Sequence, residues 1–423
     1  MSRARKILLA SVVAALAATQ ARAADIPVPA GDGLAQAIAG AAPGDVLQLA
    51  AGLHRGPVVI ATPHLTLLGL PGAVINGGGR GNVITVAASD TILRGLTIRG
   101  SGLDLTAKNS GVFIGRGADR AVVSDNRFVG NLIGVYLDGS HDALVRHNRI
   151  QGLLRLRLNE RGPAVELFDT PGSRIEDNDI SGGRDGVFSV TSHANVVRGN
   201  SFRQLRFAVH FMYTNGSTVA DNVSRGNDIG YAMMYSDRLV LDGNVSDGDR
   251  EHGLLFNYAN DSRITGNVVR GSEKCVFIYN ANKNRFSGNW FEGCGIGVHF
   301  TAGSERNAIT GNAFVRNRTQ VMYVGTRSLD WAENGRGNYW SDNPGFDLQG
   351  RGIADAAYRP NDVVDQVIWR APAAKLLLNS PAVQVLHWAQ AAFPAIHPGG
   401  VIDSAPLMQP PRPAALARLE ATP

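Results

Sequence analysis

Histidine and methionine residues recur in the middle of the chain at spacings that could bring their side chains together. His210 and Met212 are two residues apart, and Met234 follows Met212 at the interval that separates many neighbouring asparagines of this chain. Imidazole and thioether groups suit Cu(I), whereas a site for a hard cation would be built from oxygen ligands. These three residues are candidate metal ligands if the fold brings them to one surface. The alternative is a methionine- and aromatic-rich patch that adapts to a protein partner.

Carboxylate pairs that could support catalysis are scarce. No Asp-Asp dipeptide occurs in the chain. In the repeat fold described below, only Asp138 and Glu166 are expected to approach each other on the outer face that carries the candidate ligands. Enzymes that act on acidic polysaccharides need paired carboxylates, or carboxylates with calcium and a basic residue. We interpret these two residues as solvated carboxylates and expect no catalytic activity. A polysaccharide lyase, epimerase or hydrolase is the alternative.

The two cysteines, Cys275 and Cys294, are too few for a disulfide scaffold. Their spacing in the sequence matches no common zinc site. In an oxidising compartment they could form a disulfide with each other. A disulfide, free buried thiols and metal ligation all remain open from the sequence.

Residues 1–23 have the pattern of a secretory signal peptide. Four basic residues and no acid flank the apolar run 7–18, which is too short to span a bilayer, and Ala21-Arg22-Ala23 fits a cleavage site. Without this segment, 37 basic residues (41 less these four) face 36 acidic ones, so the basic excess needed for nucleic-acid binding is missing. We expect an exported periplasmic protein with no membrane anchor and no nucleic-acid partner.

A short asparagine-centred repeat must position the candidate ligands. An apolar residue precedes each asparagine by three positions, and a small residue with an apolar-x-apolar triplet follows it. Glycine, at 50 of 423 residues, favours tight turns over helices. Most neighbouring asparagines differ by 22 or 23 in residue number, and Asn148 and Asn178 differ by 30. The nine asparagines are Asn126, Asn148, Asn178, Asn200, Asn222, Asn244, Asn267, Asn289 and Asn312.

Such a short repeat fits one coil of a parallel β-helix, in which each strand pairs with the same strand one coil away. We predict an all-β fold: a single right-handed parallel β-helix of about eleven coils over residues 24–325. The one longer interval is a coil with a loop at 153–160. A leucine-rich repeat, the nearest alternative, would need a Leu-x-x-Leu-x-Leu signature that is missing.

Residues 326–423 form an irregular, partly helical C-terminal tail in this prediction. Ser380-Pro381 starts a helix near 381–393, and residues 395–423 are expected to be extended. The apolar sides of the helix, around Trp388, either cap the open end of the solenoid or dock onto a partner.

Strand alternation places the candidate ligands on one face. With Val209 inward, His210 and Met212 face outward, and Met234 takes the place of Met212 one coil later, about 4.8 Å away. Met233 then points into the core. His299 and Met322 share the column of His210 but lie about 19 and 24 Å away, so they would at most form a second site.

Several segments of the chain resemble the NosD family, the periplasmic maturation proteins of nitrous oxide reductase. The resemblance covers nearly the whole mature chain and includes the tail as well as the repeat. The segments that carry it are Val209–Tyr213, Tyr231–Met234, Gly297–Glu305, Gly335–Asp342, Leu378–Pro381 and Asp403–Met408.

The resemblance implies a β-helix held at the inner membrane by an ABC transporter, made of the NosF ATPase and the NosY membrane subunit. It implies transient binding of copper, received from the lipoprotein chaperone NosL and passed towards the copper-sulfide centre of the reductase. Family members often carry an acidic, calcium-like run after Tyr-Trp-Ser-Asp. Here residues 347–352 have lost most of its acids, so calcium is not expected. The choice of His210, Met212 and Met234 as copper ligands rests on their spacing.

Overall fold

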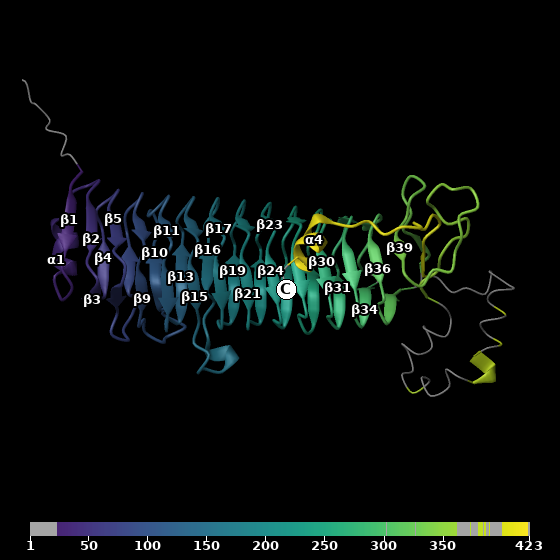
Figure 1. The fold of residues 1–423 in the computed structure, drawn as a ribbon, viewed down its shortest axis with the longest axis horizontal. Coiled ribbons are helices and arrows are strands. Elements are labelled where there is room, and N and C mark those ends of the chain that lie inside the picture. Colours follow the sequence, from purple (N-terminus) through teal and green to yellow (C-terminus); the bar gives the residue numbers. More distant parts are fainter. Residues whose placement is uncertain are drawn as a thin grey trace, which may run out of the picture.

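The structure is a computed structural model that describes residues 23–301, 303–325, 327–361, 373, 380–383, 385, 389 and 400–421. The chain forms a single right-handed parallel β-helix with three sheets along its length (Figure 1). Every strand of these sheets pairs in parallel with its counterpart one coil away, which confirms the predicted fold class. The predicted signal peptide, apart from Ala23, lies outside the described residues.

Two of the sheets have thirteen strands each. Sheet A consists of β1 (Asp25–Val28), β2 (Val46–Leu49), β5 (Thr66–Gly69), β8 (Ile92–Arg94), β11 (Val122–Ser124), β14 (Leu144–Arg146), β17 (Arg174–Glu176), β20 (Val196–Arg198), β23 (Thr218–Ala220), β26 (Val240–Asp242), β29 (Arg263–Thr265), β32 (Arg285–Ser287) and β35 (Ala308–Ile309). Sheet B consists of β3 (Gly52–Arg55), β6 (Ala73–Asn76), β9 (Thr97–Arg99), β12 (Arg127–Val129), β15 (Arg149–Gln151), β18 (Asp179–Ser181), β21 (Ser201–Arg203), β24 (Val223–Arg225), β27 (Val245–Asp247), β30 (Val268–Arg270), β33 (Trp290–Glu292), β36 (Ala313–Val315) and β39 (Tyr339–Trp340).

Sheet C has twelve strands and carries the candidate ligands. Its strands are the longest in the middle of the solenoid, where most have six residues. They are β4 (Val58–Ile60), β7 (Ile84–Val86), β10 (Ser110–Ile114), β13 (Ile133–Asp138), β16 (Val165–Phe168), β19 (Asp185–Val190), β22 (Phe207–Met212), β25 (Ile229–Met234), β28 (His252–Asn257), β31 (Lys274–Tyr279), β34 (Ile296–Thr301) and β37 (Thr319–Val324).

Stacked asparagines satisfy the buried backbone at one turn of each coil. The backbone N–H of Asn200 donates to Oδ1 of Asn222 (3.0 Å), and the side-chain amide of Asn222 donates to the carbonyl of Val197 (2.8 Å). The same bonds join all nine predicted asparagines and continue from Asn312 to Asn338. A buried polar stack in which every member is bonded avoids the cost of unpaired amides and fixes the register of the coils.

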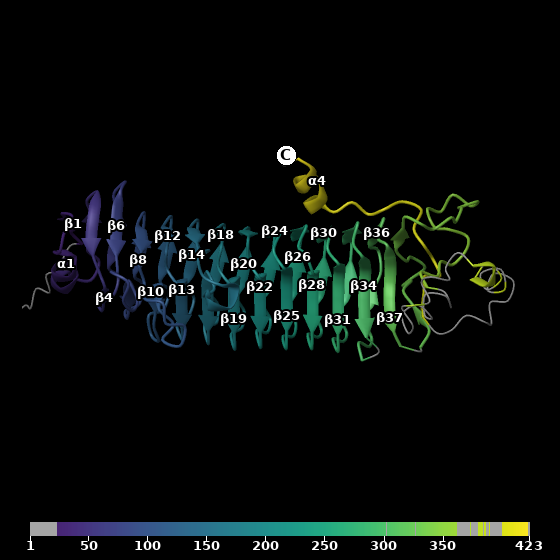
Figure 2. The same cartoon turned by 90° about the horizontal axis from the view of Figure 1, so that it is seen from below.

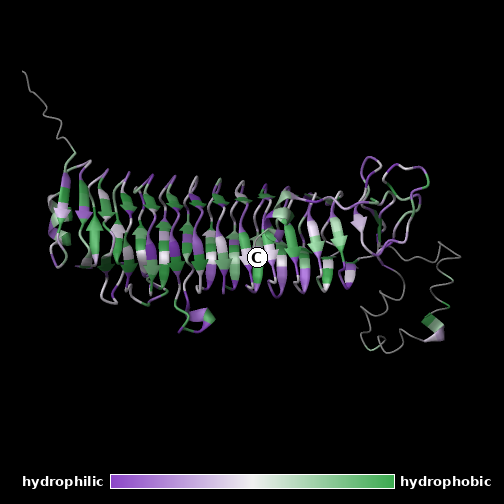
Figure 3. Cartoon of the chain, viewed as in Figure 1, coloured by the Kyte–Doolittle hydropathy of each residue, from purple (hydrophilic) through white to green (hydrophobic). Residues whose placement is uncertain are grey.

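The solenoid has more coils than the eleven predicted. The additional coils precede Asn126, where leucine stands in the asparagine position, so the repeat is harder to detect in the sequence. The backbone N–H of Leu96 still donates to Oδ1 of Asn126 (2.9 Å). This bond joins the coils that have leucine in the asparagine position to the stack of asparagines. Buried apolar side chains form one core cluster that runs along the solenoid. Hydrophobic residues recur in the strands over its whole length (Figure 3).

Both ends of the solenoid are covered. At the N-terminal end, α1 (Leu34–Gly40) buries Leu34 and Ile38. At the other end, β38 (Leu329–Asp330) pairs with β40 (Val401–Ile402), and the buried Asp403 accepts hydrogen bonds from the Asn338 backbone and from Trp340 Nε1 (2.8 Å). Residues 400–403 are therefore part of the folded body.

The chain then returns along the outside of the solenoid to α4 (Ala414–Glu420) (Figure 2). The helix packs Ala415, Leu416 and Leu419 against apolar residues of sheet B, and Arg418 bonds to the Gly243 carbonyl (2.7 Å). The expected extended end is thus wrong over α4, because its apolar side has a surface to cover. The predicted helix near 381–393 falls mostly outside the described residues; Pro381–Val383, Val385 and Ala389 are helical.

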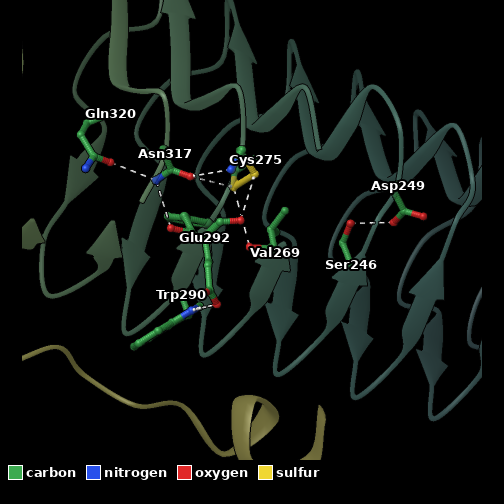
Figure 4. The surroundings of a disulfide bond; sticks show 10 residues. Ser246, Asp249, Val269, Cys275, Trp290, Glu292, Asn317 and Gln320 are labelled. Carbon is green, nitrogen blue, oxygen red and sulfur yellow. Dashed lines mark hydrogen bonds between the residues drawn. A yellow bond between two sulfur atoms is a disulfide. The ribbon is translucent and has the colours of Figure 1, made fainter. Parts of the chain in front are cut away.

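The two cysteines form a disulfide, one of the three alternatives that the sequence left open. Cys275 begins the buried part of β31, and Cys294 precedes β34 in the next coil, with the two Cα atoms 5.7 Å apart (Figure 4). The Cys294 backbone N–H donates to Oδ1 of Asn317 (2.9 Å). Within the described residues, no helix is long and apolar enough to cross a membrane.

Candidate metal centre

The outer face of sheet C brings the three predicted ligands together in the expected register. His210 and Met212 lie on β22, and Met212 pairs directly with Met234 on β25. Val209 and Met233 are fully buried in the interior, as alternation predicted. Adjacent strands are about 4.8 Å apart, so the two thioether side chains start from neighbouring positions.

His210 is enclosed although it faces outward. Its residue is only 6% exposed, the Phe188 ring stacks on the imidazole and the Phe207 ring meets it edge-on, both at 4.7 Å between centroids. Among the described residues, neither ring nitrogen has a hydrogen bond of ordinary geometry. Nδ1 lies 3.5 Å from Oδ2 of Asp185, at the limit of hydrogen-bond distance.

Asp185 is a buried carboxylate that faces Nδ1 of the imidazole. Arg206 donates to it through Nε (2.9 Å) and Nη2 (2.8 Å). Burial alone would raise the pKa of Asp185, but His210 and the Arg206 guanidinium outweigh it and hold the pKa below its usual value. A carboxylate facing Nδ1 favours the proton on that nitrogen, which leaves a lone pair on Nε2. Metal-binding histidines are commonly oriented in this way.

The two methionines place thioether groups on the same face as His210. Met212 and Met234 are both partly buried, and Met234 packs beside Ile229, Ala232 and Leu255. Nowhere in the described ranges do three His, Cys, Asp or Glu side chains gather as a hard or borderline metal would require. His210, Met212 and Met234 place one imidazole and two thioethers on the same face, and ligands of these types suit Cu(I).

A second His–Met pair lies further along the same face. His299 on β34 pairs in register with Met322 on β37. Burial, helped by the positive charge of Lys274, lowers the pKa of His299 to about 4. The Lys274 ammonium also lies 4.9 Å from the centre of the Phe277 ring, which contacts His299. The charged group nearest to this pair is thus an ammonium, whereas the one nearest to His210 is a carboxylate that is itself paired with Arg206.

The interpretation of Glu166 as a solvated carboxylate is wrong. Its residue is only 3% exposed, and Oε1 accepts a hydrogen bond from Lys108 Nζ (2.6 Å). The 101–109 loop brings this lysine over the sheet from 58 residues away, a contact that the repeat could not predict. Asp138 is half-buried at the end of β13.

A stack of tyrosines beside the methionines was missed. Tyr213 and Tyr235 directly follow Met212 and Met234, and Tyr258 occupies the same place in the next coil. The successive ring centroids are 5.1 and 5.2 Å apart, and each ring is about half exposed. All three residues have a positive φ, which is uncommon for bulky side chains. The available signal in the sequence was that these tyrosines recur with the same period as the asparagines.

The loop that follows Tyr-Trp-Ser-Asp is closed by its own hydrogen bonds. The Asp347 carboxylate accepts from the backbone N–H groups of Arg351 (3.0 Å) and Gly352 (2.6 Å). Asp355 accepts from the Leu348 backbone and from Arg351. The carboxylates that remain in this run are thus engaged with backbone and guanidinium donors.

Solved structures resemble the chain in fold. The Dettilon tailspike protein gp208 has a TM-score of 0.52 at 14% identity, over 71% of this chain and 68% of that one. PfbA, a surface adhesin of Streptococcus pneumoniae, has a TM-score of 0.52 at 12% identity, over 69% of this chain and 85% of that one. Identities this low establish the parallel β-helix and nothing about function.

Sequence relatives cover most of the chain. A sequence model of the family described as "Periplasmic copper-binding protein (NosD)" matches residues 146–345. A Stutzerimonas stutzeri protein named "Probable ABC transporter binding protein NosD" is 42% identical over 379 residues, 86% of this chain and 87% of that protein. A Pseudomonas aeruginosa protein of the same name is 40% identical over 377 residues, 86% of this chain and 88% of that protein. The chain therefore belongs to the NosD family of periplasmic copper-binding proteins.

Proposed function

We propose that this protein is a periplasmic Cu(I) carrier that works with an ABC transporter in the maturation of nitrous oxide reductase. His210, Met212 and Met234 bind the ion as it passes from a chaperone of the NosL type towards the copper-sulfide centre of the reductase. The protein is not itself a catalyst in this proposal. Family membership supports copper binding and association with a transporter.

The observation that carries the proposal is an imidazole that faces a buried carboxylate and shares its sheet face with two thioethers. Asp185 faces Nδ1 of His210, so Nε2 is the nitrogen that can bind a metal ion. Met212 and Met234 start from paired positions on adjacent strands of the same face. A carrier needs ligands that can be exchanged, and neutral thioethers are displaced more readily than thiolates would be. The two phenylalanines that enclose His210 keep water away from the ion.

Ligand identity can be tested by X-ray absorption on the Cu(I)-loaded mature protein. We expect sulfur and nitrogen scatterers in wild type, and a smaller sulfur contribution after Met212→Leu with Met234→Leu. Leucine keeps nearly the same volume, so the fold is retained. Oxygen-only coordination in wild type, or a spectrum that the double substitution leaves unchanged, would contradict the assignment. Met408→Leu is the matched control at a distant methionine.

The absence of catalysis can be tested with a panel of uronate polymers. We expect no turnover by the purified mature protein. Robust turnover that is lost on Asp138→Asn or Glu166→Gln would overturn this part of the proposal and favour a polysaccharide enzyme.

Contact with the transporter subunits, of the NosY and NosF type, is assigned to the apolar segment around Trp388. Deleting the whole tail would also remove Asp403 and α4, which belong to the folded body, so a single substitution is cleaner. Trp388→Ala should lower retention on membranes about tenfold, since tryptophan is enriched among interface hot spots. Phe346→Ala, at a residue that is 58% exposed, is the control. Unchanged retention after Trp388→Ala would place the contact elsewhere.

A further inference from the structure

A groove lies beside the candidate metal centre, between the 101–109 loop and the outer face of sheet C. It encloses about 630 Å³, and the residues that matter for its chemistry are Lys108, Tyr136, Asp138, Glu166, Phe168 and Phe188. The loop is held down by an apolar cluster in which Leu105 packs beside Tyr136 and Leu153. The groove is therefore a formed feature with one wall of loop and one of sheet.

The groove contains carboxylate oxygens that lack donors. Oε1 of Glu166 is bonded to Lys108, but Oε2 is buried and has no hydrogen-bond partner in the described part of the chain. The Asp138 carboxylate likewise forms no hydrogen bond or ion pair with any described residue. A buried acceptor without a donor is costly, so a ligand that supplies N–H groups here would gain from both oxygens.

Among the residues that line the groove, two carboxylates, Asp138 and Glu166, stand against one ammonium, Lys108. Lys108 is matched by Glu166, and Arg116 is matched by Asp169 at 3.2 Å, which leaves the negative charge of Asp138 without a partner among the described residues. Burial, together with the negative charges of Asp138 and Glu166, raises the pKa of Tyr136, as expected where negative potential persists. The excess of acceptors and of negative charge favours a cationic group over a neutral one.

The walls suit a cation as well. The Lys108 ammonium lies 5.8 Å from the centre of the Tyr136 ring, so the groove already holds one cation against an aromatic face. Phe168 is 43% exposed, which leaves ring surface for a planar guanidinium. The Phe188 ring is already contacted by His210 and by the Arg184 guanidinium, so the free aromatic surface is that of Phe168. Arginine combines five donors with a face that stacks on aromatic rings.

The groove leads directly to the candidate copper ligands. Phe188 and Val190 line it on β19, and they pair in register with His210 and Met212 on β22. A chain segment lying in the groove would thus end within one strand spacing of the ligand set, about 4.8 Å.

We propose that this groove binds an arginine side chain of the protein that exchanges copper with this chain, with Asp138 and Oε2 of Glu166 as its acceptors. The guanidinium pairs with the two carboxylates and stacks on the aromatic walls, which positions the partner's own copper ligands beside His210 and Met212. The reference to copper exchange rests on the proposed function; the guanidinium site itself rests on the groove.

The test uses the full mature protein and the peptide acetyl-Gly-Arg-Gly-amide, with citrulline in place of arginine as the neutral match. Binding is followed by saturation-transfer NMR across the millimolar range. The arginine peptide should bind and the citrulline peptide should not. Asp138→Asn and Glu166→Gln should each weaken binding about tenfold, the loss expected when one charge of a close pair is removed. Asp261→Asn removes an equal charge from a distant turn and should change nothing.

A substitution that is expected to strengthen peptide binding distinguishes an effect on the site from a general loss of folding. Lys108→Gln removes the internal cation and frees Oε1 of Glu166, so it should strengthen binding of the arginine peptide severalfold. No binding of that peptide to wild type overturns the inference, as does preferential binding of a neutral hexasaccharide such as maltohexaose. Cu(I) affinity is measured on the same variants and should be unchanged. If wild type binds the arginine peptide but does not bind Cu(I), the proposed function is contradicted and the guanidinium site is not.

Discussion

Two imidazoles face outward from the same column of sheet C, and the charged group nearest to each is different: a carboxylate that is itself paired with Arg206 for His210, and an ammonium for His299. His210 has a buried carboxylate at 3.5 Å and methionines on its own and the next strand. His299 has a methionine on the next strand, but the nearby charge is the ammonium of Lys274. Residue type and position in the repeat are therefore not enough to make a site for a cation. We propose that side chains at the start of neighbouring strands, Asp185 on β19 and Lys274 on β31, make the first pair more suitable for Cu(I) than the second.

We expect the largest effect on Cu(I) affinity from removing the Asp185 carboxylate. Asp185→Asn should lower Cu(I) affinity by about 10- to 100-fold, the usual cost of losing the partner of a metal-binding histidine. The measurement is anaerobic competition with a chromophoric Cu(I) chelator. Glu273→Gln, near the second pair, is the control. Equal affinities for Asp185→Asn and wild type would mean that the carboxylate serves only to bind Arg206.

Removing the Lys274 ammonium should bring the Cu(I) affinity of His299 and Met322 closer to that of the His210 site. Lys274→Gln is expected to raise Cu(I) affinity at His299 and Met322 about fivefold, since one partly screened charge is worth roughly 1 kcal/mol. The substitution should be measured in a protein that carries His210→Phe, so that only the second pair responds. A fall in affinity would show that Lys274 organises the site and does not oppose it.

The smallest expected effect is on how the free energy of unfolding depends on pH. The folded pKa of His299, about 4, is below its unfolded value of about 6.5, so the unfolded chain binds more protons between these pH values. Stability should therefore fall as the pH drops through this window, by about 1–2 kcal/mol after allowing for partial exposure. Urea unfolding of wild type and His299→Phe checks it, with the exposed His193→Phe as control. An unchanged slope in His299→Phe would contradict the assignment.

Features that recur with the asparagine repeat could be predicted from the sequence. Met212 and Met234 are one coil apart, so strand register followed from counting, and so did the asparagine ladder. Contacts from irregular segments could not be counted in this way. Lys108 reaches Glu166 from a loop outside the repeat, and Asp185 is a polar residue buried at a strand start. Cys275 and Cys294 are separated by less than one coil of sequence, so their pairing depends on the turn between them.

The most direct test of the account is the Cu(I) affinity of three proteins measured side by side under anaerobic conditions. These are the wild-type mature protein, the triple variant His210→Phe, Met212→Leu, Met234→Leu, and the double variant His299→Phe, Met322→Leu. The account predicts that the triple variant loses at least about 100-fold in affinity and that the double variant stays close to wild type. If the triple variant binds Cu(I) as tightly as wild type while its association with protein partners drops, the methionine face is only an interaction surface and the copper assignment is wrong.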